Sequence, residues 1–339
     1  GRETRNGYRM PRSRGPLFTV ARASLLAATV SRAETRRVPA EWEPQAAVWM
    51  QWPGRYEKDM RPAFADIIQA VQKHENVHLL ANSAKEQKAA AGFLMNRGVS
   101  VANVSWHVVP IDNAWMRDNG PIYVTDGETL TIQNWAFTGW DGTTGATYRK
   151  DDKVPLHLGA LLGIEDADLT DYVLEKGNLE DNGAGIALLN WDCQDQRNPG
   201  MKREEHEQIL KQALGLTEII WSYGHHPDDI TTGHIDGSAR FVNATTVALA
   251  DTGEETETRL AEDLQTLGFN IEWYPGDVNW LVGDGYVVAM SELDAALDAT
   301  LRQALKRYFP GREVYLVDAW SIADGGGGIH CVTNEQPAL

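Results

Sequence analysis

The C-terminal segment DGGGGIHCVTNEQP, residues 324–337, has the composition of a loop that presents a reactive thiol. Glycine has the most backbone entropy to lose and no side chain to pack, so four in a row rule out an ordinary helix or strand interior. Gly328 ends this run, and Cys331 follows it by three residues. A thiol on such a loop can be reached by a planar substrate and by backbone N–H donors. We therefore expect Cys331 to be a nucleophile and Gly328 to bind substrate, although a lone cysteine is more often a small buried residue after a turn.

A second cluster, TGHIDGSARF at residues 232–241, contains an imidazole and a carboxylate two positions apart. If this segment is a strand, His234 and Asp236 project to the same face. An imidazole beside a carboxylate can transfer protons near neutral pH. A structural hydrogen bond or a partial zinc site are the alternatives, but the nearby candidates for further zinc ligands, His225 and His226, do not have a recognised ligand spacing. We expect no metal.

Two further acidic residues occur where chain segments end. Asp118 lies in WMRDNGPIYV, residues 115–124, where turn residues precede a strand-like stretch. Its carboxylate could bind a cation at the mouth of a cavity, or it could pair with Arg117 in a turn. Glu175 follows the strand-like DYVL and precedes a turn rich in glycine and asparagine, so by itself it reads as a charged turn.

Alternating apolar patterns predict the elements that position these side chains. Residues 47–52 and 77–82 are strand-like, and residues 60–73 between them have helical spacing. Predicted helices at 204–214, 254–267 and 293–308 lead into predicted strands at 217–223, 271–274 and 313–318, and hairpin patterns cover 121–135 and 280–290. Units of two strands, a helix and a strand recur, which predicts an internally repeated α/β architecture and a single domain over residues 38–339.

Composition limits the classes of partner. A formal charge of −17 argues against a basic surface for nucleic acid and is compatible with attraction of small cations. Two cysteines exclude a disulfide framework and favour a reducing compartment. Because no apolar run approaches the ~18 residues that span a bilayer, we expect a soluble protein without a membrane partner.

The first 37 residues differ from the rest, with nine arginines against two acids. They read as a disordered basic arm, a transit-like leader or a translation artefact, and Arg22 interrupts the apolar stretch that a secretory signal needs. We expect a cytoplasmic protein, or an organelle-targeted one if residues 1–37 are a true transit segment.

Three motifs, WMRDNGP, TTGHIDG and GGGGIHCVTNEQP, occur in the order typical of one enzyme family. Together they resemble the agmatine deiminases and bacterial peptidylarginine deiminases, members of the guanidine-modifying pentein superfamily. The opening PAEWEPQAAVWMQWP, residues 39–53, resembles the usual start of that family, so the resemblance extends over residues 38–339.

This resemblance implies a five-bladed α/β-propeller of strand-strand-helix-strand units around a negatively lined central cavity. It implies that Cys331 forms the covalent intermediate, that His234 and Asp236 act beside it, and that Asp118 holds the guanidinium. Glu175 matches the glutamate of the family's Glu-Gly-Gly motif, another partner of the substrate or of the histidine.

Asn279, in DVNWLVGDG, matches an asparagine before a hairpin in the same family, where a substrate contact is implied. Several positions depart from the family pattern. Lys176 interrupts the Glu-Gly-Gly motif, and an inward-pointing ammonium there would weaken the negative field. The other departures are Asn182 for an aspartate, Thr138 for an asparagine, and Asn334 and Glu335 for two glutamines.

The resemblance predicts hydrolytic deimination of a small cationic guanidinium substrate, with agmatine converted to N-carbamoylputrescine and ammonia through a cysteine thiouronium. No metal or organic cofactor is required. Three alternatives stay open: protein citrullination by a peptidylarginine deiminase, an amidinotransferase, and a non-catalytic binding protein of pentein fold. The sequence leaves the oligomeric state open, a homodimer included, and Cys193 reads as structural.

Overall fold

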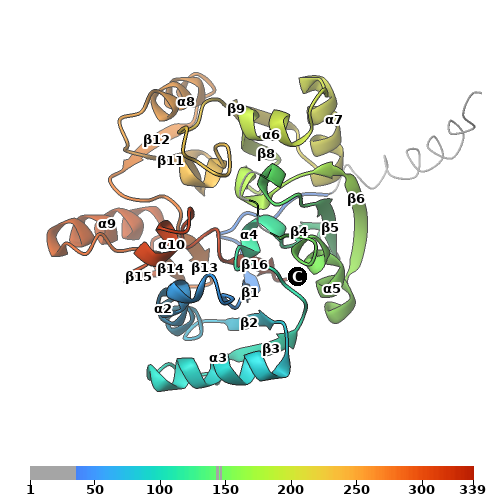
Figure 1. Cartoon of the computed structure of the whole chain (residues 1–339). Coiled ribbons are helices and arrows are strands. Elements are labelled where there is room, and N and C mark those ends of the chain that lie inside the picture. The colour runs from blue at the N-terminus through green and yellow to red at the C-terminus, as the bar shows by residue number, and fades with distance from the viewer. Residues whose placement is uncertain (1–35, 143–144, 146) are drawn as a thin grey trace, which may run out of the picture. The chain divides into compact units, whose positions relative to one another are not determined.

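The computed structural model describes residues 36–339 except 143–144 and 146. Over this part of the chain the strands form five separate sheets, one of four strands and four of three (Figure 1). The basic extension expected at residues 1–37 lies outside the described residues apart from its last two. Of these, Arg37 forms an isolated antiparallel bridge with Thr125.

The strands and helices follow one another at short intervals along the chain. The strands are β1 (Gln45–Gln51), β2 (Asn76–Ala81), β3 (Val104–Val108), β4 (Ile122–Thr125), β5 (Leu130–Ala136), β6 (Glu165–Val173), β7 (Glu180–Asp181), β8 (Ile186–Asn190), β9 (Glu218–Ser222), β10 (Ala239–Asn243), β11 (Thr246–Ala250), β12 (Asn270–Tyr274), β13 (Leu281–Gly283), β14 (Tyr286–Met290), β15 (Glu313–Val317) and β16 (Asn334–Pro337). The α-helices are α2 (Arg61–Val71), α3 (Ala84–Asn96), α4 (Met116–Asn119), α5 (Val154–Leu162), α6 (Trp191–Arg197), α7 (Arg203–Leu214), α8 (Glu255–Thr266), α9 (Ala295–Tyr308) and α10 (Trp320–Ala323).

Four of the sheets repeat one pattern of pairing. In each, an antiparallel hairpin is followed by a helical segment and a third strand that pairs in parallel with the second: β4-β5-β6, β7-β8-β9, β10-β11-β12 and β13-β14-β15. A parallel partner needs a crossover connection, and a helix supplies it while covering one face of the sheet. The repeated α/β architecture predicted from the sequence is therefore confirmed.

The remaining sheet joins the two ends of the described chain. Its order is β16-β1-β2-β3, with β16 antiparallel to β1 and with β1, β2 and β3 parallel. Because β16 directly follows the glycine-rich segment, its pairing with β1 fixes the end of the loop that carries the thiol. Figure 1 shows the five sheets following one another around the short helix α4.

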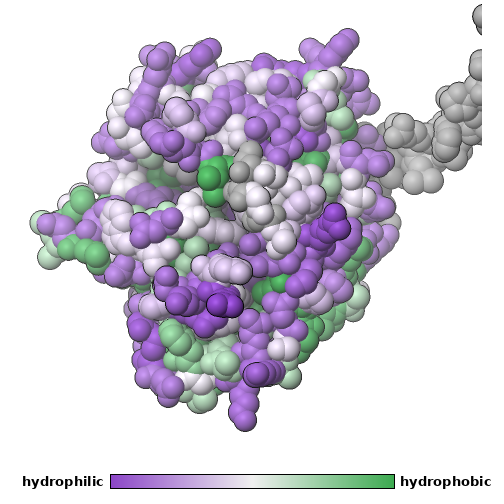
Figure 2. All heavy atoms as spheres, in the orientation of Figure 1, coloured by the Kyte–Doolittle hydropathy of each residue, from purple (hydrophilic) through white to green (hydrophobic). Residues whose placement is uncertain are grey.

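The predicted apolar faces form the core. In α2 the side chains of Phe64, Ile67, Ile68 and Val71 are fully buried, as their helical spacing predicts. Charged and polar side chains predominate on the face seen in Figure 2. No helix in the described part of the chain is long and apolar enough to cross a bilayer.

One local prediction is wrong. The segment with His234 and Asp236 is not a strand but the one-turn 3₁₀-helix η5 (Ile235–Gly237), for which His234 is the N-cap. Thr232 and Gly233, which precede His234, have φ of 63° and 89°. These left-handed backbone angles lie outside the β region that strand residues adopt. The hydroxyl of Thr231 accepts the backbone N–H of His234 at 3.0 Å and so stabilises the turn.

Candidate active site

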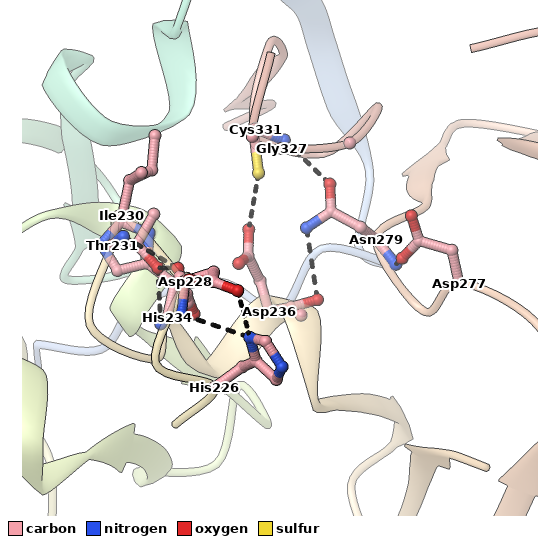
Figure 3. Close-up of a pocket in the computed structure, with 14 residues that line it drawn as sticks. His226, Asp228, Ile230, Thr231, His234, Asp236, Asp277, Asn279, Gly327 and Cys331 are labelled. Carbon is pink, nitrogen blue, oxygen red and sulfur yellow. Dashed lines mark hydrogen bonds and ion pairs between the residues drawn. The ribbon is translucent and has the colours of Figure 1, made fainter. Parts of the chain in front are cut away.

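A pocket of about 330 Å³ lies where three loops meet (Figure 3). One loop precedes and includes η5, one precedes β13, and one is the glycine-rich segment. The lining residues are His226, Asp228, Asp229, Ile230, Thr231, His234, Asp236, Gly237, Asp277, Asn279, Gly326, Gly327, Gly328 and Cys331.

Cys331 projects into this pocket from the loop between α10 and β16. Its backbone N–H donates to Oδ1 of Asn279 at 3.1 Å, and its Sγ lies 3.8 Å from Oδ2 of Asp236. A Cβ atom added to Gly327 would lie 3.1 Å from the sulfur, and one added to Gly328 would lie 2.5 Å from Oδ1 of Asn279. The glycines are therefore required for the close approach of the loop, as their clustering predicts.

Asn279 connects the thiol loop with the η5 turn. Its Nδ2 donates to the backbone oxygen of Asp236 at 3.3 Å while its Oδ1 accepts from Cys331 (Figure 3). Its own backbone N–H donates to Oδ1 of Asp277 at 2.8 Å. Asn279 lines the pocket, and both polar ends of its side chain contact backbone groups.

His234 lies between two buried carboxylates from other parts of the chain. Its Nε2 is 2.7 Å from Oε2 of Glu175, and its Nδ1 is 3.4 Å from Oδ1 of Asp118. A Cβ on Gly177 would lie 2.5 Å from Nδ1 of His234 and 2.7 Å from Oδ1 of Asp118. Glycine at position 177 thus makes room for this contact.

Asp118 lies in α4, which precedes β4, and is buried. Its Oδ2 accepts the indole N–H of Trp140 at 2.8 Å, whereas its Oδ1 has no hydrogen-bond partner among the described residues. Trp140 was not identified from the sequence. Its backbone has a φ of 57°, and the two glycines that flank Trp140-Asp141 in TGWDG are the signal that could have pointed to an unusual turn.

Glu175 is held by Arg197, whose role was not predicted from the sequence. Arg197, at the end of α6, donates from Nε to Oε1 of Glu175 at 2.8 Å and from Nη2 to Oε2 at 3.0 Å. Its Nη2 also donates to the backbone oxygen of Thr231 at 3.0 Å. Because both oxygens of Glu175 are engaged, this residue orients His234 and does not line the pocket.

Lys176 departs from the family pattern, and an acidic residue from a distant part of the sequence balances its positive charge. Lys176 is buried, and its Nζ donates to Oε1 of Glu335 at 2.6 Å and to Oδ1 of Asn334 at 3.0 Å. Glu335 also pairs with Arg117 at 2.7 Å. The ammonium is therefore neutralised within the protein, and the turn-like pairing of Asp118 with Arg117 considered from the sequence is wrong.

His330 links the pocket residue Asp236 to buried residues outside the pocket. Its Nδ1 is 2.7 Å from Oδ2 of Asp236, and its Nε2 is 2.8 Å from Oε2 of Glu41. Glu41 in turn accepts from Arg240 at 2.6 Å. The sequence reasoning did not identify this buried network, although His330 directly precedes Cys331.

Burial and the neighbouring charged side chains determine which of the pocket side chains are protonated. Burial, and then the charges of Asp236 and Asp118, raise the pKa of Cys331 well above its usual value, so its thiol holds a proton. Burial lowers the pKa of His234, but Asp118, Cys193 and Glu175 outweigh burial and raise it. The imidazole is therefore a cation and a proton donor.

The pKa values of the Asp118 and Asp236 carboxyl groups are shifted in opposite directions. Burial raises the pKa of Asp118 to about 7, with Glu175 and Asp236 adding to the effect and His234 opposing it. Burial also acts to raise the pKa of Asp236, but the hydrogen bond and charge of His330 outweigh it and lower the pKa. Asp236 is thus the carboxylate of the two that stays ionised at neutral pH.

One group among the described residues has the geometry to approach a metal ion. Side-chain atoms of Glu175, Cys193 and His234 lie within 4.8 Å of one another. Both oxygens of Glu175 already bind Arg197, and the group does not include the histidines at 225 and 226. The geometry gives no support for the zinc alternative that involved those two histidines.

Comparisons with known proteins agree with this geometry. Residues 37–268 and 274–337 match the family model of the Porphyromonas-type peptidyl-arginine deiminases. The chain belongs to this family. The resemblance to the agmatine deiminases and bacterial peptidylarginine deiminases identified from the three motifs is therefore confirmed.

Individual relatives are similar over nearly the whole chain. Agmatine deiminase of Pseudomonas aeruginosa is 29% identical, covering 91% of this chain and 97% of the relative. The solved structure of Enterococcus faecalis agmatine deiminase is 22% identical with a TM-score of 0.80, covering 90% and 97%. A substrate-bound cysteine-to-serine variant of C. jejuni agmatine deiminase is 20% identical with a TM-score of 0.77, covering 89% and 96%. These two structures share the fold of this chain.

Proposed function

We propose that this chain hydrolyses a guanidinium group to a ureido group and ammonia, and that agmatine is the substrate, giving N-carbamoylputrescine. The observation that carries the proposal is the convergence of the Cys331 thiol, the His234 imidazole and the Asp118 and Asp236 carboxylates from distant segments. The family membership supports the reaction class, and the named relatives support the substrate. We also propose that the five sheets are the blades of a pentein propeller around this pocket.

The two carboxylates hold the planar cation. Charge-assisted, paired hydrogen bonds between a guanidinium and carboxylates fix its plane as well as its position. Oδ1 of Asp118 accepts no hydrogen bond within the described residues, although it lies 3.4 Å from Nδ1 of His234, and it is available for one edge of the group. Asp236 takes the other edge beside the sulfur, so the guanidinium carbon is oriented toward Cys331.

The first half-reaction forms the covalent intermediate. The cation lowers the pKa of the buried thiol, and Cys331 transfers its proton to Asp236, its hydrogen-bond partner at 3.8 Å, as the sulfur bonds to the guanidinium carbon. His234 then donates a proton to the departing nitrogen. The C–N bond breaks, ammonia leaves, and a thiouronium remains on Cys331.

The second half-reaction returns the enzyme to its starting state. Neutral His234 takes a proton from water as the oxygen bonds to the thiouronium carbon. The C–S bond breaks as Asp236 returns to the sulfur the proton that it took from Cys331. The new hydroxyl group then loses its proton to the freed Asp236 carboxylate, which releases it to water, where it converts the departed ammonia to ammonium. The product is a neutral ureido compound, and His234 is again a cation.

Ammonia release from agmatine, free arginine and an arginyl peptide tests the substrate. We expect turnover of agmatine at least about 100-fold above the other two, since a pocket that rejects a wrong group by leaving polar atoms unpaired discriminates by such factors. Cys331→Ala is the control for enzyme-borne activity and should release no ammonia. No turnover of agmatine by the parent chain would refute the proposal.

The description of the matching family favours one further candidate, peptidyl-arginine. The same covalent chemistry would apply, and only the tail entering the pocket would differ. Preferential turnover of the arginyl peptide in the same assay would establish this activity in place of agmatine deimination.

A further inference from the structure

His330 is a buried titratable residue next to the nucleophile that the proposed reaction does not use. Its side chain is 1% exposed, and it does not line the pocket. Its two ring nitrogens contact two carboxylates, Asp236 at 2.7 Å and Glu41 at 2.8 Å. The ring is therefore a bridge between a pocket carboxylate and one behind it.

The backbone holds this ring in one place. The N–H of His330 donates to the backbone oxygen of Asn279 at 3.0 Å, and its carbonyl accepts from Nε of Arg117 at 3.1 Å. Asn279 also contacts Cys331 and Asp236. Movement of His330 would consequently disturb both the thiol loop and the η5 turn.

The far end of the bridge is equally fixed. Oε1 of Glu41 accepts the backbone N–H of Val282 at 2.7 Å, and Oε2 accepts Nη2 of Arg240 at 2.6 Å. Arg240 also donates to Glu180 at 2.9 Å. Because Glu41 receives donors on both oxygens, it is a fixed acceptor for His330 and cannot follow the ring if the ring moves.

The two short contacts need two protons. A neutral imidazole donates from one nitrogen only, so two carboxylates at 2.7 and 2.8 Å require one further proton, on the ring or shared with a carboxylate. Burial and the charges of Arg117 and Arg240 lower the pKa of His330, whereas its bond to Asp236 favours the protonated ring. Each of the two contacts needs a hydrogen, so the ring and its two carboxylates hold two protons between them.

We propose that His330 is a positioning residue: it holds Oδ2 of Asp236 beside the Cys331 sulfur and, with Glu41 behind it, keeps Asp236 as a fixed, ionised carboxylate. The part of this proposal that concerns guanidinium binding rests on the proposed function. The orientation and ionisation of Asp236 do not depend on which substrate is turned over.

Other charges face Asp236 and must be considered in the test. His234 is on the same turn, Asp118 is on α4 and Asp277 precedes β13; each interacts electrostatically with Asp236. Arg117 and Arg240 add positive charge from α4 and β10. The test therefore changes only His330 and leaves these groups in place.

Two variants separate the two halves of the bridge. In His330→Asn the short amide can still donate to Asp236 from the position of Nδ1, whereas in His330→Gln the longer amide reaches Glu41 from the position of Nε2 and leaves Asp236 without its donor. Thermal unfolding of both variants measures any general loss of stability. A purely structural role for His330 would affect Asp236 similarly in both.

The direct readout is the titration of the Asp236 carboxyl by ¹³C NMR of the whole chain, with the resonance assigned from its loss in Asp236→Asn. We expect the parent to titrate below the range of an exposed aspartate, His330→Asn to stay close to it, and His330→Gln to move to higher pH. A parent titration above the ordinary aspartate range would overturn the proposal, even if neither variant folds. Equal titration in parent and His330→Gln would also overturn it.

Kinetics give the second readout. At pH 6 we expect His330→Gln to raise KM for agmatine about tenfold, with a smaller change in kcat, because Asp236 without its donor is then mostly protonated and only its ionised fraction binds the cation. His330→Asn should recover most of the affinity. If the parent does not turn over agmatine, the proposed function fails, and the Asp236 titration still decides the role of His330.

Discussion

At the scale of single residues, the site depends on buried charges that are only partly compensated. One oxygen of Asp118 accepts a hydrogen bond from Trp140, the other accepts none within the described structure, and burial raises the pKa of Asp118 to about 7. A guanidinium would supply the missing donors and favour the ionised form. Binding and protonation at Asp118 are therefore coupled.

This coupling predicts the acid side of the pH profile. A carboxyl whose pKa is raised to about 7 is ionised above that pH and protonated below it. We expect kcat/KM for agmatine to fall as pH decreases below about 7, approaching tenfold per unit. In Asp118→Asn this limb should disappear, with kcat/KM at pH 8 lowered at least about 100-fold, while the exposed control Asp263→Asn stays at the parent value. A parent profile that is flat down to pH 5 would contradict the assignment.

The contact of Gly177 with His234 predicts the effect of one added methyl group. In Gly177→Ala the new Cβ would overlap Nδ1 of His234 and Oδ1 of Asp118, at 2.5 and 2.7 Å, so the two side chains must separate. Because a displacement of about 1 Å at a reacting group costs about 100-fold in rate, we expect kcat to fall by that factor.

The control for Gly177→Ala is Gly92→Ala in α3, where no heavy atom lies within 4 Å of the added Cβ. There the substitution should stabilise the helix by about 0.5–1 kcal/mol without changing kcat. Equal kcat for parent and Gly177→Ala would mean that the spacing of His234 and Asp118 does not limit the reaction.

At the scale of elements, two of the departures from the family pattern, Lys176 and Glu335, belong to one buried ion cluster. Lys176 in the turn after β6 and Arg117 in α4 share the carboxylate of Glu335 in β16. In Glu335→Gln two buried cations lose their ionic partner, and we expect the free energy of unfolding in urea to fall by about 3–5 kcal/mol. Adding Lys176→Met should recover part of this loss because one of the two cations is removed.

An exposed ion pair provides the matched control. Lys211 and Glu207 pair across one turn of α7 at 3.2 Å, with about a third of each side chain exposed. Replacing Glu207 by Gln should change the unfolding free energy by less than about 1 kcal/mol. If Glu335→Gln costs no more than this surface change, the cluster does not contribute to stability in the way its burial indicates.

Elements with a clear apolar period were predictable from the sequence, and elements fixed by distant contacts were not. The helix expected at 254–267 is α8, and the one expected at 293–308 is α9, which begins at Ala295 because Asp294 caps it. The η5 turn was mistaken for a strand because its shape depends on left-handed residues and on the hydroxyl of Thr231. Alternation of side chains alone does not encode such a turn.

At the scale of the whole described chain, the sequence predicted the repeated α/β units but not the pairing of β16 with β1 that joins the two ends. The strand β16 is NEQP, which has no strand-like alternation, and its partner β1 lies almost 300 residues earlier. For the same reason Trp140, Arg197 and His330 were missed as neighbours of the predicted side chains. Their roles arise from contacts between segments that are far apart in sequence.

The family motifs could be predicted because each keeps its chemistry within a few residues. Cys331, His234, Asp236 and Asp118 come from three motifs. The fold places the first three on one pocket, and Asp118 lies behind His234, with its Oδ1 3.4 Å from Nδ1 of that imidazole. Whether the pocket recognises a guanidinium and directs it to the sulfur is the central claim. Burial alone does not distinguish the two thiols, since Cys193 is 1% exposed and Cys331 is 6% exposed.

Labelling of the intact chain with 2-chloroacetamidine, a guanidinium mimic with a leaving group, tests this claim most directly. We predict one adduct, mapped to Cys331 by peptide mass spectrometry, formed more slowly in the presence of agmatine and absent in Cys331→Ala. Cys193 should stay unmodified because no pocket carboxylates direct the cation to it. Labelling of Cys193 at the same rate as Cys331, or labelling of Cys331 that agmatine does not slow, would contradict the account.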